Sequence, residues 1–139
     1  MKRLRKFLGL PTHLKLLFLA AVFLIAISIL FLRIFLFPHV QRFVANKKIG
    51  RPSRISSLQI VRAVQAAALL FRKGNCLPQA LVALYLLKIN GYGSELKIGV
   101  LPDGSRIQAH AWLEQDGRVL IGGAGSPALY QQLVYQGPE

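Results

Sequence analysis

Cys76 and His110 are the residues whose types and spacing could perform chemistry. Cys76 is the only cysteine of the 139 residues, and it lies in GNCLPQALVALYLL, where a helix is expected to begin. His110 follows 34 residues later in AHAWLEQDG, in the middle of a predicted strand. A thiol at a helix start and an imidazole on a neighbouring strand are the minimal parts of a cysteine nucleophile and its base.

The first turn of a helix is a favourable place for a reactive thiol. Unpaired N–H groups and the helix dipole stabilise a thiolate there, and the same groups could hold an oxyanion. The side chain of Gln79 is a further candidate oxyanion donor. A lone cysteine is more often a small buried hydrophobe, and a lone histidine in such a strand is more often a structural residue. The two residues together favour the catalytic interpretation.

Two helices are predicted ahead of the strands. From residue 58 to 71, apolar side chains recur at intervals of three and four, which indicates an amphipathic helix packed on a neighbour. A second helix should begin at Cys76, with Asn75 as its N-cap, and should stop at Gly91. Its side chains from 80 to 87 are apolar on every face, so this helix is expected to be central and buried.

An antiparallel meander is predicted to carry the histidine. Its strands should be joined by two-residue hairpins at Asp103-Gly104 and Asp116-Gly117. The expected strands are 95–100, 106–115 and 118–121. In the middle strand His110 and Trp112 share one face. Trp112 is expected in the core, with the wall of a substrate cleft as the alternative.

Residues 1–56 are predicted to form a basic segment that contains an apolar helix, followed by a domain at 57–139. The stretch 16–37 is apolar apart from Ser28 and Arg33. As a helix it rises about 33 Å, close to the thickness of a bilayer core. Basic residues flank it in equal number on both sides, so the positive-inside rule assigns no orientation. We expect a single-pass membrane anchor, with a core helix of a soluble subdomain as the alternative.

The net charge of the chain limits the classes of partner that it is expected to bind. A net charge of +13 suits nucleic acid, an anionic membrane or an acidic partner. The charge concentrates beside the apolar helix and no recognition motif is visible, which disfavours nucleic acid. One cysteine excludes an intramolecular disulfide, and with three histidines it offers too few ligands for structural zinc. We expect neither a metal nor a cofactor.

Two blocks carry a resemblance to a known family. CLPQALVALYLLKINGYGSELKIGV, which begins at Cys76, and AHAWLEQDGRVLIGG resemble the B-type leader peptidases of lasso-peptide biosynthesis, in the transglutaminase-like superfamily. The likeness extends over residues 58–133. It implies an α+β fold in which a small papain- or transglutaminase-like core follows the membrane helix. It also implies that Cys76 is the nucleophile and His110 the base of a peptidase that cuts a ribosomally made precursor at the leader–core junction.

The third catalytic residue of such enzymes has no evident counterpart. Many relatives carry an acid about a dozen residues after the histidine, where this chain has Gly122 and Gly123. With an unbulged hairpin at Asp116-Gly117, His110 would lie opposite Gly123. Asp116 itself would be about 20 Å away along the strand. A backbone carbonyl, a residue beyond Gly123 and a Cys–His dyad without a third member are the open alternatives.

The resemblance also implies partners and a location. The partners are the lasso precursor peptide, a separate small leader-binding protein and the cyclase that forms the macrolactam, and the site should face the cytoplasm at the bacterial inner membrane. Two other functions stay open. One is a non-catalytic scaffold that holds precursor and cyclase together, which the missing acid favours. The other is an acyl transferase on another substrate, which would form the same thioester.

Overall fold

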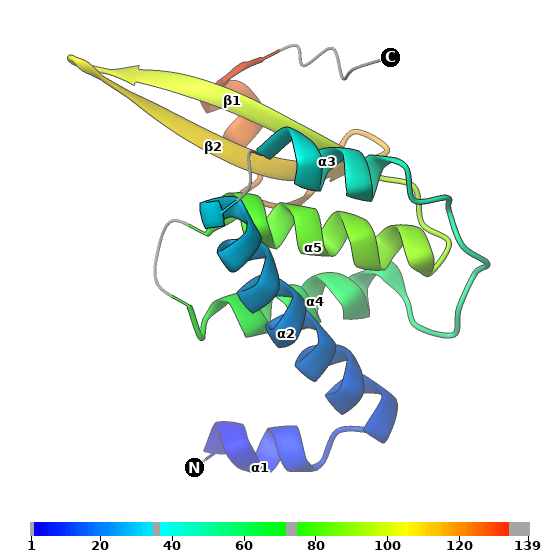
Figure 1. Ribbon diagram of the computed structural model, residues 1–139. Coiled ribbons are helices and arrows are strands. Elements are labelled where there is room, and N and C mark those ends of the chain that lie inside the picture. The colour runs from blue at the N-terminus through cyan, green and yellow to red at the C-terminus, as the bar shows by residue number, and fades with distance from the viewer. Residues whose placement is uncertain (1, 35–36, 72–74, 134–139) are drawn as a thin grey trace.

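The computed structural model describes residues 2–34, 37–71 and 75–133, in which helices pack on one face of a four-stranded antiparallel sheet (Figure 1). The helices are α1 (Lys2–Leu8), α2 (Thr12–Ile34), α3 (Phe37–Ala45), α4 (Ser57–Ala68), α5 (Cys76–Ile89) and α6 (Ser126–Leu129). The strands are β1 (Glu95–Asp103), β2 (Arg106–Gln115), β3 (Arg118–Ile121) and β4 (Gln131–Gln132), in the order β3-β2-β1-β4. This mixture of helices and antiparallel strands confirms the predicted α+β class.

Helices α4 and α5 form where the apolar spacing predicts them. A capping box between Ser56 and Gln59 starts α4. The next helix begins at Cys76, as predicted, and Pro78 lies in its first turn, where the missing N–H costs no hydrogen bond. Asn75 occupies the N-cap position, but its side chain makes no capping hydrogen bond. The predicted burial of α5 is confirmed, because seven of the eight residues from 80 to 87 are buried.

The two hairpin loops set the pairing of β1 with β2 and of β2 with β3. Asp103 pairs with Arg106, so the first loop is Gly104-Ser105, one residue later than predicted. The second loop is Asp116-Gly117, as predicted. Both of its residues have positive φ, 51° and 75°, as a type I′ turn requires.

A β-bulge corrects the predicted register between β2 and β3. Glu114 pairs with Val119, whereas Leu113 pairs with Ile121, so one extra residue stands in β3. The unbulged pairing that set His110 opposite Gly123 is therefore wrong. Beyond the bulge, Gly122 comes to lie against the backbone of Trp112.

The long apolar helix α2 is part of the packed body. It runs from Thr12 to Ile34, whereas the sequence suggested 16–37; residues 35 and 36 of that prediction lie outside the described residues, and Phe37 belongs to α3. Its length and composition would allow it to cross a membrane. One stripe of its residues is nevertheless buried in the core that α4 and α5 also form.

Candidate active site

Cys76 lies at the start of the central helix and is half-buried. The N–H of Gln79 donates to the carbonyl of Asn75. An oxyanion at this end would therefore bind the N–H groups of Cys76 and Leu77, or the half-buried side chain of Gln79. The first turn thus carries both a thiol and donors for the charge that thiol chemistry creates.

His110 is held by a backbone carbonyl. Its Nε2 lies 2.6 Å from the carbonyl oxygen of Gly122. Because a carbonyl only accepts, Nε2 carries the proton of this hydrogen bond, and Nδ1 is the nitrogen that can take up another proton. The ring also contacts Tyr130, at 4.9 Å between ring centroids. Of the alternatives that the sequence left open, the structure contains the backbone carbonyl.

Ser126 is a site residue that the sequence did not reveal. This buried residue donates its hydroxyl to the same Gly122 carbonyl, at 2.6 Å. The carbonyl therefore accepts from Ser126 and from His110 together. Only the Gly-Gly pair signalled an unusual backbone here; the return of the chain from β3 to α6, which brings Ser126 into place, leaves no pattern in the sequence.

Gly122 cannot be exchanged for an acid without rearrangement. Its φ is 104°, in the region that favours glycine. A Cβ at this position would lie 2.5 Å from the Cβ of Trp112 and 2.9 Å from the carbonyl oxygen of Ala111. The close approach of the two backbones gives a physical reason for glycine at this position.

The carboxylates of the described residues have other roles. Glu95 binds Lys97, whose hydrogen bond and positive charge lower the pKa of the Glu95 carboxyl. Glu114 accepts from the indole N–H of Trp112, and Asp103 accepts from Gln108. Asp116 lies in the β2–β3 turn. Within the described ranges, no carboxylate forms a hydrogen bond with His110.

The two faces of the sheet have different cover. Leu113 and Ile121 belong to the core that the helices share. The alternating residues His110 and Trp112 lie on the other face, against Tyr130, which directly follows α6. Trp112 is fully buried, as expected for a core residue, and supports this face without lining an open cleft.

Cys76 begins the helix that packs on one face of the sheet, whereas His110 lies on the other face, against Tyr130. The strand β1 returns along α5, and the tip of the β1–β2 hairpin projects past the end at which α5 begins (Figure 1). The 14 residues of α5 rise about 20 Å, the length of six strand residues, which reaches from Glu95 to the region of Gly99 and Leu101. Gly99 is the partner of His110. Within the described residues, however, the thiol and the imidazole form no hydrogen bond.

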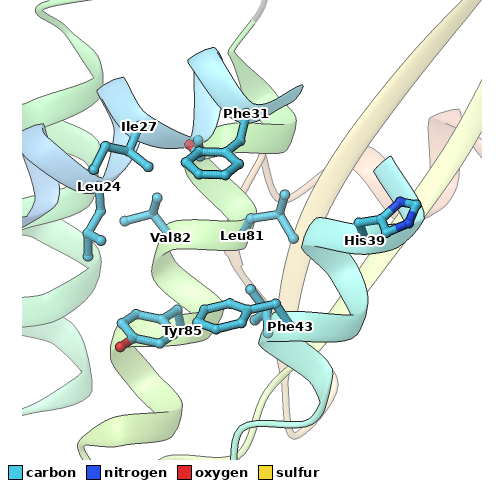
Figure 2. Close-up of a pocket in the computed structure, with 10 residues that line it drawn as sticks. Leu24, Ile27, Phe31, His39, Phe43, Leu81, Val82 and Tyr85 are labelled. Atoms are coloured by element: carbon cyan, nitrogen blue, oxygen red, sulfur yellow. The ribbon is translucent and has the colours of Figure 1, made fainter. Parts of the chain in front are cut away.

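An apolar cavity among the described residues is separate from Cys76 and His110. It has a volume of about 550 Å³ and lies between α2, α3 and α5. Figure 2 shows its apolar walls, among them Phe31, Leu81 and Tyr85. Neither Cys76 nor His110 lines it, so it is not the place where a substrate would meet the thiol.

The fold and the site together define a class of protein. A central helix that begins with the lone cysteine and packs on an antiparallel sheet that carries the histidine is an architecture of cysteine peptidases and acyl transferases. The model of the transglutaminase-like superfamily matches residues 21–135, and the chain belongs to that superfamily. Its members are typically cysteine peptidases or transglutaminases. The matched range includes the second half of α2 and spans the boundary predicted at residues 56 and 57. No curated protein and no solved structure matches the chain.

Proposed function

We propose that this protein is a cysteine peptidase that removes the leader from a ribosomally synthesised lasso-peptide precursor. The observation that carries the proposal is the lone cysteine at the first turn of α5, in a chain of the transglutaminase-like superfamily. The resemblance of the two sequence blocks supplies the substrate class. Cys76 is the nucleophile and His110 the base.

The chemistry follows from the two side chains. Nδ1 of His110 takes the thiol proton, and the sulfur of Cys76 attacks the carbonyl carbon of the scissile bond. N–H groups of the first turn of α5, with Gln79, hold the oxyanion. The imidazolium then protonates the leaving amine, and a thioester remains on Cys76. Water, deprotonated by the same imidazole, hydrolyses that thioester and frees the thiol.

This mechanism requires the thiol and the imidazole to come together. Because His110 lies on the face of the sheet away from α5, substrate binding would have to move the strand segment that carries it, and not only shorten a hydrogen bond. The hydrogen bond to Gly122 selects the tautomer that leaves Nδ1 free, which is the task an acid performs in a triad. The carbonyl of Gly122 therefore takes the role of the third residue in this proposal.

The proposed reaction has partners. A separate small protein binds the leader, as the resemblance of the two sequence blocks implies, and a cyclase receives the cleaved core peptide. We place the protein at the bacterial inner membrane, with the site in the cytoplasm, where a nucleophilic thiol stays reduced.

Two alternatives have support of their own. The absence of a hydrogen bond between Cys76 and His110 among the described residues favours a scaffold that holds precursor and cyclase without cleaving. Membership of the superfamily equally supports an acyl transferase, which forms the same thioester and passes the acyl group to an amine. A product with a new amide bond identifies the transferase.

The decisive experiment uses the single thiol. We expect the purified full-length protein, mixed with precursor and leader-binding protein, to cleave the precursor, whereas Cys76→Ala and Cys76→Ser abolish cleavage. Circular dichroism and melting temperature should be unchanged in both variants. Mass spectrometry of an acid-quenched reaction should find the acyl adduct on the peptide that contains Cys76. Maturation by Cys76→Ala at the wild-type rate would establish the scaffold instead.

A further inference from the structure

Helix α2 presents one face to the domain. Its buried residues, Leu17, Ala21, Ile25 and Ser28, lie within about 80° of one another at 100° per residue. They join the core to which α4 and α5 contribute. This half of the helix is therefore already covered by protein.

The opposite face of α2 is apolar and exposed. It is formed by Leu16, Leu19, Phe23, Leu30 and Ile34, here called the outer stripe. Each of these side chains is between 55% and 66% exposed. At 100° per residue they lie within about 60° of one another and opposite the buried stripe. A contiguous row of large apolar side chains of this kind marks a surface that contacts a membrane or another protein.

The apolar surface continues beside the outer stripe. Leu24, Ile27 and Phe31 of α2 line the cavity of about 550 Å³ that α3 and α5 complete (Figure 2). On the helix these residues lie between the outer stripe and the buried stripe. The cavity thus offers an apolar recess at the flank of the exposed row, large enough to admit part of a hydrocarbon chain.

Positive charge stands at both ends of α2. Four exposed basic residues of α1 precede it: Lys2, Arg3, Arg5 and Lys6. Arg33 stands in its last turn, and exposed Arg42 and Lys48 follow. A helix that crosses a bilayer usually leaves an excess of such residues on one side, and this chain shows no excess. A helix that lies along an anionic surface brings both ends to the same lipid headgroups.

We propose that α2 docks in the plane of an anionic bilayer, with its outer stripe in the acyl boundary and its buried stripe still packed on the domain. To span the membrane, α2 would have to leave α4 and α5 and uncover the core that they share with it. In-plane docking leaves that core intact, buries the outer stripe in the acyl boundary and brings the basic residues at both ends of α2 to the lipid headgroups. The proposal is independent of peptidase activity.

Because Cys76 is the only cysteine, labelling can locate both ends of α2. In full-length Cys76→Ser protein, single cysteines are introduced by Lys6→Cys or Lys48→Cys, both at exposed sites. Sealed vesicles of known orientation are then treated with a membrane-impermeant maleimide. We expect both positions to be labelled from the same side. Labelling from opposite sides would establish a span and overturn the proposal.

A matched pair of variants tests the stripe itself. Full-length protein is floated with vesicles of phosphatidylcholine containing about one third phosphatidylglycerol. Leu19→Ser/Phe23→Ser should weaken binding at least tenfold, whereas Ile107→Ser, at an exposed apolar residue of the hairpin tip, should not. Pure phosphatidylcholine or 1 M salt should also weaken wild-type binding.

Three results would overturn in-plane docking. They are wild-type protein that does not float with anionic vesicles, equal binding by Leu19→Ser/Phe23→Ser and Ile107→Ser, and a lipid-free dimer that needs Phe23 and excludes vesicles. Wild-type protein that binds vesicles but does not cleave the precursor would contradict the proposed function and leave in-plane docking standing.

Discussion

Replacing Gly122 by alanine should damage the site far more than the same replacement at Gly123. Both glycines have positive φ, 104° and 93°. An alanine at either position therefore carries a backbone penalty of about 1–2 kcal/mol. The two positions differ in what a Cβ would meet, so the pair separates steric conflict from backbone conformation.

The steric part can be worked out from the structure. At Gly122 the new Cβ would lie 2.5 Å from the Cβ of Trp112, about 0.9 Å closer than the 3.4 Å at which ordinary contact begins. At Gly123 the nearest atom is the hydroxyl oxygen of Ser126, at 3.7 Å, which is ordinary contact. Overpacking against a fully buried tryptophan costs about 1–3 kcal/mol. Gly122→Ala should thus melt about 3–9 °C below Gly123→Ala, at roughly 3 °C per kcal/mol.

Activity should separate the two variants further. A backbone shift of about 0.9 Å moves the carbonyl that holds Nε2 of His110, and misplacement of about 1 Å can cost about a hundredfold in rate. We expect Gly122→Ala to cleave precursor at least thirtyfold more slowly than Gly123→Ala, measured well below both melting temperatures. Equal melting temperatures would refute the packing argument. Unequal melting with equal cleavage would show that the carbonyl does not orient the base.

Three further substitutions test the same site. Ser126→Ala removes one of the two hydrogen bonds to the Gly122 carbonyl, worth about 1 kcal/mol, so cleavage should fall about fivefold; a rate equal to wild type would show that Ser126 only packs. Asp116→Asn should change cleavage less than tenfold, because Asp116 stabilises the turn, whereas His110→Ala should remove activity. A thousandfold loss of cleavage in Asp116→Asn, at unchanged melting temperature, would contradict the observed β2–β3 register.

Secondary structure and turns could be predicted from the sequence wherever they depend on neighbouring residues. Apolar spacing predicts α4, and the all-apolar run predicts a buried α5. The start of α5 at Cys76 was also predicted, with Pro78 in its first turn, although the side chain of Asn75 makes no capping hydrogen bond. The Asp116-Gly117 turn follows from its two residue types. These features depend on hydrogen bonds and side-chain periods within a few residues, which the order of the chain contains.

The partner of His110 depended on the tertiary structure. One extra residue in β3 brings the Gly122 carbonyl to the imidazole, and the return through α6 brings Ser126 to that carbonyl. Neither the bulge nor the return through α6 leaves a recognisable pattern in the sequence, because the packing of whole strands decides where a bulge forms. The sequence could therefore exclude Asp116 by distance but could not choose among its alternatives.

The same division applies to α2. Its sequence is apolar on nearly all sides, which led us to expect a membrane span and left a core helix as the alternative. Only packing against α4 and α5 distinguishes the buried stripe from the outer stripe. The hydrophobicity of each residue can be read from the sequence. The tertiary structure decides which face of the helix packs on protein and which face stays exposed to another surface.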